Sequence, residues 1–483
     1  MSTSFPEKIA KCALDHYHKK LDKGKPKDET EWTVYAAIIA SLSDAEDVNS
    51  SSDMWVVSCA TGTKVTTLRE EGCILHDCHA EVLSRRGLVR VLQSEMIQWK
   101  QSKDASDSRK KAPNDSSSRH LLETTDDDTT KFQLRKDLQL HLYISDSPCG
   151  DGSIYAVDDK EDNDGVQYTG AKVIVSQDTG VDSANCGGHH QLLDGTHVAR
   201  EEVQLLGKLR TKSGRSNLPA HLRSTSMSCS DKIARWSILG LQGGLLSDCV
   251  VDPIRLTSVV VSRDPRVTLT PQSESDTLDD AQLLALERAI PMRVQAVCEY
   301  LDNDDDDDCA IRIPMVHVVS QVFDSGKAAT AARSTKQRQP EKEPSSHNNI
   351  RVVEAKAFNE ESGKKRKRGE GPTISPCGFA LNWQQSEPIQ TEILVGARGI
   401  RQGKKPKSKE DYHKLASRLS RVELLRAQRR LLRKHEHAKT YQEFKNQSCC
   451  SNKKWRELKL DIIKGGPLIG WLVQEEDFSI PDG

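Results

Sequence analysis

The sequence lacks several features that define whole classes of protein. It contains no apolar run approaching the roughly 18 residues that a membrane-spanning helix needs. Its first residues, MSTSFPE, are polar and carry no secretory signal pattern. It has 13 cysteines, an odd number, yet no Cys-x-x-Cys pair occurs anywhere. These absences argue against a membrane span, a secreted disulfide framework and a zinc knuckle, and they predict a reducing compartment with mostly free thiols.

Charge is plentiful but unevenly distributed. Aromatic residues make up only 5% of the 483 residues and charged residues 29%, while the formal net charge is −1. That near-neutral sum argues against a uniformly basic nucleic-acid binder. Residues 401–460, however, hold 19 Lys and Arg against 6 Asp and Glu, whereas 124–164 and 302–308 are acidic. The asymmetry predicts a basic face for a polyanion.

The hydrophobic pattern alternates between helical and strand periodicity. It predicts helices over 28–44, 78–99, 232–241, 279–300 and 410–447, and strands over 54–59, 138–144 and 254–261. Gly243-Gly244 follows the third of these helices and is expected to end it. This alternation predicts α/β layering. We expect one domain over 1–480, with disordered polar insertions at 101–135 and 325–372.

A basic cluster, Lys364-Lys365-Arg366-Lys367-Arg368, lies in the second insertion. It is interpreted either as a nuclear import signal or as part of a solvated linker. The sequence leaves both interpretations open, and the expected location is the nucleus, the cytoplasm or both.

Three short motifs carry the chemistry. They are Cys78-His79-Ala80-Glu81, Pro148-Cys149-Gly150-Asp151, and Ser228-Cys229-Ser230-Asp231-Lys232. Together they offer one imidazole, two thiolates and one spare carboxylate, which can hold a zinc ion with an open fourth position beside a proton shuttle. Such a site makes hydroxide at neutral pH, which hydrolytic removal of an amino group from a base requires.

Local geometry refines this hypothesis. His79 and Glu81 are two residues apart, so we expect them at the first turn of a helix, where their side chains can converge. Cys149 follows a proline and is expected at a helix start, and Cys229 precedes a third helix. The positive end of a helix favours a thiolate. The alternatives are a structural zinc site closed by four protein ligands, and a Cys149 that is simply a buried apolar thiol.

At these motifs the chain resembles the adenosine deaminases acting on RNA, within the cytidine-deaminase-like superfamily. Generic deaminases place their two cysteines close together, whereas Cys149 and Cys229 are 80 residues apart, as in the adenosine-to-inosine editing domain. The resemblance implies an α/β fold: a three-layer core with a mixed sheet between helices, and a helical, basic C-terminal extension. Within the family the chain most resembles the branch that acts on tRNA. The deaminase pattern starts within 60 residues of Met1. We therefore expect no double-stranded RNA-binding domain before that pattern.

The resemblance also implies roles for individual residues. His79, Cys149 and Cys229 would ligate zinc, and Glu81 would move protons between water, N1 of adenine and the departing ammonia. The implied substrate is the anticodon stem-loop of alanine tRNA, at the adenosine just 3′ of the anticodon (adenosine 37). The alternatives are a double-stranded RNA-specific adenosine deaminase and a non-catalytic RNA-binding relative; a nucleoside cytidine deaminase fits the spacing poorly.

Family members bury inositol hexakisphosphate in the core, and six phosphates need a dense ring of polar and cationic side chains. The matching positions are Lys64, Val82, Arg85, Arg86, Ser226, Lys232, Arg235, Trp236, Gln242, Tyr441, Lys445 and Trp471. Ser226 stands where the family has Thr, and His76 where the editors have Asn. The alternative is that these cations form a solvated face.

Two further residues are candidate RNA contacts. Thr63 lies in the turn after the predicted strand 54–59, and Arg215 lies near the place where double-stranded editors insert a Glu into the duplex. An anticodon loop already presents an unstacked base, so a tRNA deaminase has less need of that wedge. Arg215 is therefore interpreted as a phosphate contact or as a solvated loop residue.

Overall fold

The computed structural model describes most of the chain, with gaps. The described residues are 3–27, 29–42, 54–104, 119–125, 131–157, 166–167, 169–176, 190–192, 206–212, 223–267, 270–271, 278–302, 311–336, 374–385, 391–431, 438–450, 453–464, 466–472 and 477–479. Structural statements below concern these residues.

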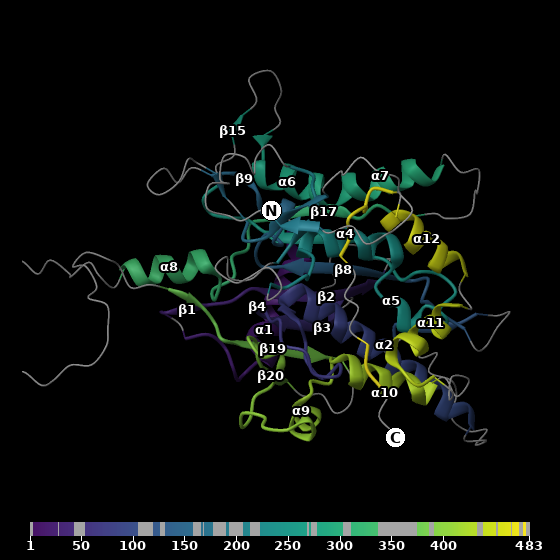
Figure 1. The fold of residues 1–483 in the computed structure, drawn as a ribbon. Helices are drawn as coiled ribbons and strands as arrows, with labels where there is room; N and C mark the ends of the chain where they lie inside the picture. The colour runs from purple at the N-terminus through teal and green to yellow at the C-terminus, as the bar shows by residue number, and fades with distance from the viewer. Residues whose placement is uncertain are drawn as a thin grey trace, which may run out of the picture.

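A mixed sheet of eight strands forms the centre of the molecule (Figure 1). Its order is β17 (Met315–Val319), β14 (Ser258–Ser262), β8 (Leu138–Ile144), β2 (Tyr35–Leu42), β3 (Met54–Thr61), β19 (Phe379–Gln384), β20 (Glu392–Val395) and β21 (Ile400–Arg401). The strands β17, β14 and β8 run parallel, and every pairing from β8·β2 to β20·β21 is antiparallel. The predicted mixed sheet is thereby confirmed.

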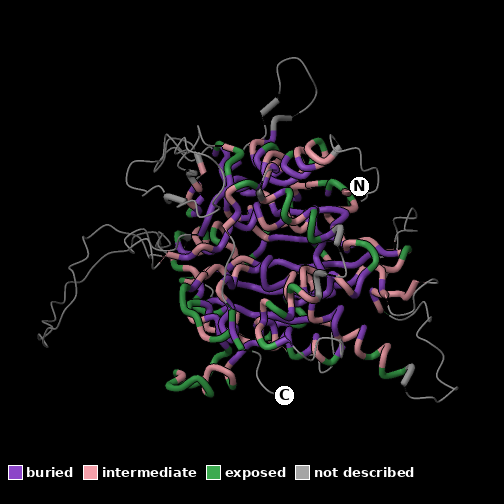
Figure 2. Tube along the Cα trace, turned by 45° about the vertical axis from the view of Figure 1, so that its right-hand side comes forward, coloured by how far each residue is buried: buried purple, intermediate pink, exposed green. Residues whose placement is uncertain are grey.

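Helices cover both faces of this sheet. Successive side chains of a strand point to opposite faces, and β2 shows the result. Its Ala37 and Ile39 pack in one core with residues of α1 (Phe5–Lys20), whereas Ala36 and Ile38 pack in another with residues of α2 (Ala80–Asp104). The buried residues form a continuous interior through the middle of the molecule (Figure 2). The predicted three-layer core is confirmed.

Shorter elements surround the core. The strands are β1 (Glu31–Trp32), β4 (Thr63–Val65), β5 (Asp77–His79), β6 (Leu122–Thr124), β7 (Phe132–Leu134), β9 (Tyr155–Ala156), β10 (Val166–Gln167), β11 (Lys172–Ser176), β12 (His190–Leu192), β13 (Arg210–Thr211), β15 (Thr270–Pro271), β16 (Leu278–Asp279) and β18 (Ser375–Pro376). The helices are η2 (Asp151–Ser153, a 3₁₀ turn), α4 (Cys229–Leu239), α5 (Gly243–Leu246), α6 (Ala281–Ala289), α7 (Pro291–Asp302), α8 (Lys327–Lys336), α9 (Lys409–Leu415), α10 (Arg421–Leu431), α11 (Tyr441–Cys450) and α12 (Lys453–Lys464). Among the described helices none is long and apolar enough to cross a bilayer.

The predicted helix over 28–44 is wrong, because this segment supplies the short strand β1 and the long strand β2. All but the last residue of β2 are buried, since layers of helices cover both faces of the sheet. A strand buried on both faces loses the alternation of polar and apolar residues, so its periodicity cannot distinguish it from a buried helix. The predicted strands over 54–59 and 138–144 are confirmed as β3 and β8, and the strand over 254–261 is shorter, starting at Ser258.

Two predicted helices are interrupted. The segment 279–300 forms α6 and α7, which break at Ile290 because Pro291 has no backbone N–H and its ring disfavours helical geometry in the residue before it. Three helices, α9, α10 and α11, replace the single basic helix predicted over 410–447. The helix predicted over 232–241 begins earlier, at Cys229, and ends at Gly240, not at Gly243-Gly244, which open α5.

The insertions predicted to be disordered contain regular structure in part. The range 101–135 holds the end of α2 and the paired strands β6 and β7, and the range 325–372 holds α8. Residues 105–118, 126–130 and 337–372, which include the basic cluster 364–368, lie outside the described residues. The acidic run 304–308 lies outside them as well.

Candidate active site

A tight hairpin presents the first motif. The strands β4 and β5 pair so that Thr63 lies opposite His79, and α2 starts directly after His79. Gly62 precedes β4 with φ +147°, where an added Cβ would lie 2.1 Å from the carbonyl oxygen of Cys78, so the hairpin requires glycine there. Glu81 occupies the first turn of α2 and is 2% exposed. His79 and Glu81 therefore stand at the start of a helix, as predicted.

The second motif lies in a loop, not at the start of an α-helix. Cys149 follows β8, and only the three-residue turn η2 comes after it, so the prediction of a helix start at Cys149 is wrong. The carbonyl oxygen of Cys149 accepts a hydrogen bond from the amide of Ser230 at 3.1 Å. This contact holds the loop against the first turn of α4.

The third motif opens α4. Cys229 is its first residue, and the side chain of the N-cap Ser228 accepts a hydrogen bond from the amide of Asp231 at 3.3 Å. The Ser228 hydroxyl also donates to the Asp231 carboxylate at 2.6 Å. The cap fixes where the helix begins and thereby the direction of the Cys229 sulfur.

The three predicted metal ligands lie near one another. The side chain of Cys149 interacts with those of both Cys229 and His79. The interaction with Cys229 is the largest effect on the pKa of Cys149 and holds it well below its usual range. The positive charges of Lys212 and His79 lower this pKa further, whereas burial opposes the change. Burial and the neighbouring Cys149 raise the pKa of Cys229.

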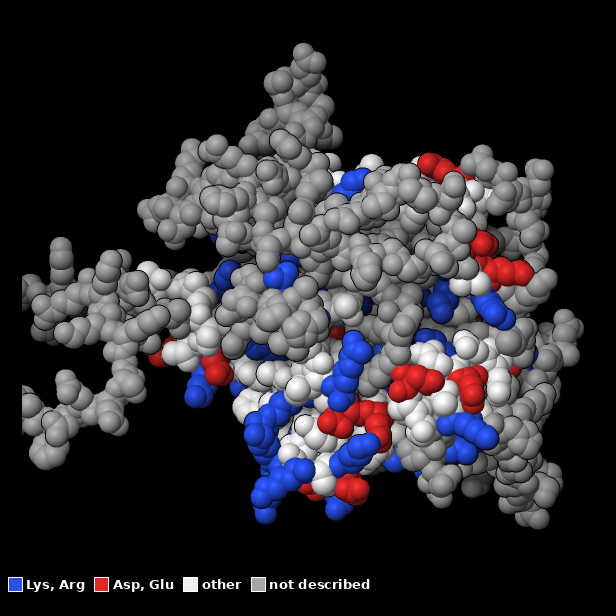
Figure 3. Space-filling model, in the orientation of Figure 1, with Lys and Arg blue, Asp and Glu red and all other residues white. Residues whose placement is uncertain are grey.

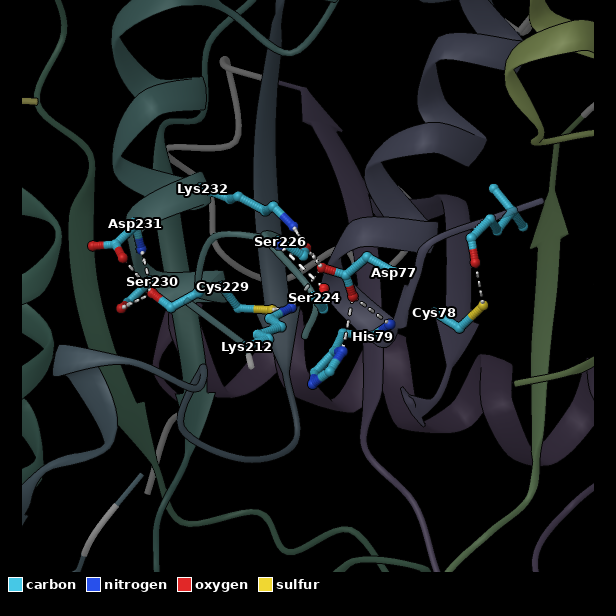
Figure 4. Close-up of polar contacts among 12 residues, drawn as sticks. Asp77, Cys78, His79, Lys212, Ser224, Ser226, Cys229, Ser230, Asp231 and Lys232 are labelled. Carbon is cyan, nitrogen blue, oxygen red and sulfur yellow. Dashed lines mark hydrogen bonds and ion pairs between the residues drawn. The ribbon is translucent and has the colours of Figure 1, made fainter. Parts of the chain in front are cut away.

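Cys78 lies apart from these ligands. Its thiol is fully buried and donates to the carbonyl oxygen of Leu75 at 3.6 Å. In Figure 4 its side chain points away from Asp77 and His79. Burial raises its pKa, and the structure gives it a packing role.

Asp77 connects the ligands to their surroundings (Figure 4). Its Oδ1 lies 2.8 Å from Nδ1 of His79, and its Oδ2 accepts from Lys212 at 2.7 Å, from Ser226 at 2.8 Å and from Lys232. Lys212 also donates to the sulfur of Cys229 at 2.8 Å. Burial raises the pKa of Asp77, but the two ammonium groups outweigh it and hold that pKa well below its usual range.

Two polar atoms beside these residues have no partner. Oε2 of Glu81 and Oγ1 of Thr63 are buried and make no hydrogen bond. Buried polar atoms are rarely left unpaired, and those that are often mark a place where a ligand binds. Over the described part of the chain, no three His, Cys, Asp or Glu side chains form a preassembled metal-holding group. The case for a metal therefore rests on donor chemistry and on the contacts among His79, Cys149 and Cys229.

Asp77 also lines a cavity of about 260 Å³. Nine of the twelve predicted polyphosphate residues line it: Val82, Arg85, Arg86, Ser226, Lys232, Arg235, Trp236, Lys445 and Trp471. The structure adds His76, Asp77, Thr225, Arg421 and Lys459 among others. Residues that flank the first motif, Lys232 of the third motif and residues of the C-terminal helices thus surround one small space.

The cations of this cavity are crowded. Burial, and then repulsion from Arg86 and Arg235, lower the pKa of Arg85 to about 9. Burial lowers the pKa of Arg86 and of Arg235 to about 10 each. Arg235 stacks over Trp471 at 4.5 Å and Arg85 lies over Trp236 at 5.8 Å. Among the described residues that line the cavity, Asp77 carries the one carboxylate against these cations.

Three predicted polyphosphate residues do not line the cavity. Gln242 is 1% exposed and bonds to backbone, accepting from the Ile254 amide and donating to the Leu239 carbonyl oxygen. Tyr441 stacks on Phe478 at 5.0 Å, next to the cavity residues Arg421 and Lys445. Lys64 lies on β4, packed against Gly396. Arg215 lies outside the described residues.

Sequence reasoning missed Asp77 and Lys212. Asp77 directly precedes the first motif, so its position was a usable signal. Lys212 lies in the segment Arg210-Thr211-Lys212, where nothing in the local sequence distinguishes it from other basic residues. Only the tertiary structure places it against Cys229.

The basic C-terminal stretch divides between two places. Arg421, Lys445 and Lys459 line the cavity of about 260 Å³. Exposed Lys and Arg side chains gather around α9 at the surface (Figure 3), and they include Arg401, Lys404, Lys405, Lys407, Lys409 and Lys414. Only the part of this stretch around α9 therefore forms an exposed basic surface, as predicted, whereas other cations line the cavity.

Comparison with known proteins identifies the class. The adenosine-deaminase (editase) domain family matches residues 58–304 and 311–472, which include all three motifs. The chain belongs to this family and is an adenosine deaminase. It is 24% identical to the tRNA-specific adenosine deaminase 1 of Mus musculus over 98% of both chains, and 31% identical to that of Drosophila melanogaster over 59% of this chain and 58% of the relative. It is also 31% identical to the mouse double-stranded RNA-specific adenosine deaminase, over 47% of this chain and 17% of the relative.

Proposed function

We propose that this protein catalyses the zinc-dependent hydrolytic deamination of adenosine to inosine in tRNA, at adenosine 37 beside the anticodon of alanine tRNA. The observation that carries the proposal is the meeting of His79, Cys149 and Cys229 next to the unpaired carboxylate oxygen of Glu81. The match to tRNA-specific relatives along nearly the whole chain supports tRNA as the substrate.

Zinc fits the chemistry of these donors. The Nδ1 atom of His79 is engaged by Asp77, so Nε2 is the nitrogen available to a metal, and the carboxylate fixes the orientation of the ring. Two sulfurs and one imidazole leave a fourth position open, as in catalytic zinc sites. A zinc ion held by His79, Cys149 and Cys229 would supply Lewis-acid activation of water at neutral pH.

The protein's own residues manage the protons. Glu81 accepts a proton as water adds to C6 of adenine and delivers it to N1. It then takes the proton of the hydroxyl now on C6 and passes it to the amino group, which leaves as ammonia while the C6 carbonyl forms. Adenosine and water are thus converted into inosine and ammonia. The unpaired Oγ1 of Thr63, across the hairpin from His79, is placed to meet a hydroxyl or phosphate of the RNA.

Double-stranded RNA editing is the second candidate, because relatives of that kind are also similar. Their similarity covers only about half of this chain, whereas the tRNA-specific relative in mouse aligns over 98% of it. This difference favours tRNA.

The test is to incubate the purified protein with total tRNA from cells that lack this activity and to sequence the product for adenosine-to-guanosine changes. We expect one changed position, directly 3′ of the anticodon of alanine tRNA. Conversion of long duplex RNA without any change in tRNA would instead identify a double-stranded RNA editor.

We further propose that the basic cavity lined by Arg85, Arg86 and Arg235 holds inositol hexakisphosphate. An anion that binds only the folded state stabilises it by about 4 kcal/mol at a thousandfold excess over its Kd. We therefore expect phosphate analysis of denatured protein to find one inositol hexakisphosphate per chain, and Arg235→Gln to lower both that content and the Tm. The exposed Arg456→Gln is the matched control, since Arg456 is not among the residues that line the cavity. The proposal would be contradicted if purified wild-type protein held no bound polyphosphate and the Arg235→Gln variant had the same Tm as wild type.

A further inference from the structure

A second cavity, of about 750 Å³, lies at the far end of β3 from the active site. It is bounded by α1, by the first residues of β3 from Met54 to Val56, and by the end of β19 around Trp383. The strand β3 is eight residues long, from Met54 to Thr61 next to the hairpin of Thr63, which corresponds to about 25 Å. The cavity is therefore distinct from the deamination site and from the polyphosphate cavity.

The rim of this second cavity is strongly basic. Four lysines of α1 and one arginine line it: Lys8, Lys11, Lys19, Lys20 and Arg119. Asp15 is the only carboxylate among its described lining residues, and it pairs with Lys11 at 2.9 Å and with Lys19 at 3.7 Å. The excess of positive charge favours an anionic ligand.

The floor of the cavity is aromatic. Trp55 and Trp383 are 8% and 7% exposed, and His16 contacts Trp383 edge to face with ring centroids 4.2 Å apart. Arg119 lies over the Trp55 ring at 6.0 Å. Burial and the nearby Lys20 and Arg119 lower the pKa of His16 to about 4, so its ring is neutral at physiological pH. A ligand in this cavity would thus contact both aromatic rings and cationic side chains.

Three of the lining residues carry a polar atom that lacks a partner. These atoms are Nε1 of Trp55, Nε2 of His16 and Oε1 of Gln385, each buried and without a hydrogen bond. An indole N–H donates, an amide oxygen accepts, and a neutral imidazole nitrogen does either. Such atoms are costly when unpaired, and a base with donors and acceptors on its edge offers partners to all three.

We propose that this cavity binds an unpaired nucleotide of the RNA substrate, with its base against the aromatic floor and its phosphates among the lysines of α1. The combination of cations and aromatic rings is the one that proteins use for single-stranded nucleic acid. The volume lies within the range of small-molecule sites. The inference rests on the proposed function, since it assigns the nucleotide to the same RNA that is deaminated.

The location gives the proposal a specific consequence. A nucleotide held about 25 Å from Thr63 belongs to a part of the RNA beyond the edited base. Intact alanine tRNA can reach both places, whereas its isolated anticodon stem-loop offers less RNA for the second. Losing the cavity contacts should weaken binding of intact tRNA more than binding of the stem-loop.

The test compares two double variants of the full chain. Lys8→Gln with Lys20→Gln removes two rim charges outside the Asp15 pairs, and Lys27→Gln with Lys136→Gln removes two exposed charges away from both cavities. We expect the rim variant to bind tRNA about tenfold more weakly at 0.1 M salt and to lower the salt slope of log K by about 2. The control variant should behave as wild type, and ultraviolet crosslinking followed by mass spectrometry should join tRNA to Trp55 or its neighbours.

The outcomes separate this proposal from the proposed function. Equal tRNA affinity and equal salt slope in both double variants would overturn the nucleotide site, while tRNA deamination by wild type would still support the proposed function. Binding of free AMP that tRNA does not displace would identify a free nucleotide as the occupant. Binding to phosphatidylserine vesicles that only the rim variant loses, with tRNA affinity unchanged, would assign the surface to lipid and overturn the proposal.

Discussion

Replacing Glu81 by Gln is expected to lower kcat for adenosine deamination by about 10²–10⁴-fold, the contribution of general acid–base catalysis. The amide keeps the size of the side chain, but it cannot take up and return a proton. Because Glu81 is not one of the three predicted ligands, the zinc content should stay at one per chain. The measurements are single-turnover deamination of tRNA and metal analysis of the same preparation.

The matched control is Glu95→Gln on the same helix. Glu95 is also largely buried, and burial raises its pKa to about 7, but its Oε2 accepts from the amides of Leu121 and Leu122, away from the site. We expect this variant to deaminate at the wild-type rate. Wild-type turnover by Glu81→Gln would remove Glu81 from the mechanism, and an equal loss in both variants would indicate damage to α2.

Replacing Asp77 by Asn is expected to lower the free energy of unfolding by about 3–5 kcal/mol. The Asp77 carboxylate neutralises Lys212, which is 5% exposed, and the partly buried Lys232. Without it, the two ammonium groups lose the negative charge between them. The pKa of Asp77 is lowered in the folded state, so its stabilising contribution is present above the unfolded value near 4 and is lost only as the pH falls further. The contribution of the Asp77 carboxylate should therefore be present at neutral pH and disappear under strongly acidic conditions.

The Asp77→Asn variant should also bind zinc about 10–100-fold more weakly, because the carboxylate orients His79. Urea denaturation and a zinc competition titration measure the two effects. Asp248→Asn is the control: its ion pair with Lys131 is more exposed, so its removal should cost at most about 1 kcal/mol and leave zinc affinity unchanged. Equal stability of the two variants would show that Asp77 does not hold the lysines in place.

The errors in the predicted elements have a common physical origin. The strand β2 was predicted as a helix because burial on both faces removed its polar residues, and α6 and α7 were merged because a break at one proline hardly disturbs helical periodicity. The predicted disorder at 101–135 and 325–372 failed where short polar segments gain hydrogen bonds from a partner strand or the surrounding fold. In each case tertiary contacts outweighed local composition.

The sequence by itself determined the donor set, because His79, Glu81, Cys149 and Cys229 stand in short motifs whose residue types already specify their chemistry. It also predicted most of the basic cavity, since nine of the residues named from the sequence line one space. Only the tertiary structure decided that Asp77 joins this cavity to the ligands, that Lys212 contacts Cys229, and that α1 forms a basic rim over Trp55. These contacts join residues that are far apart in the chain. The distances between such residues are set by the packing of the whole sheet, so no local sequence pattern can predict them.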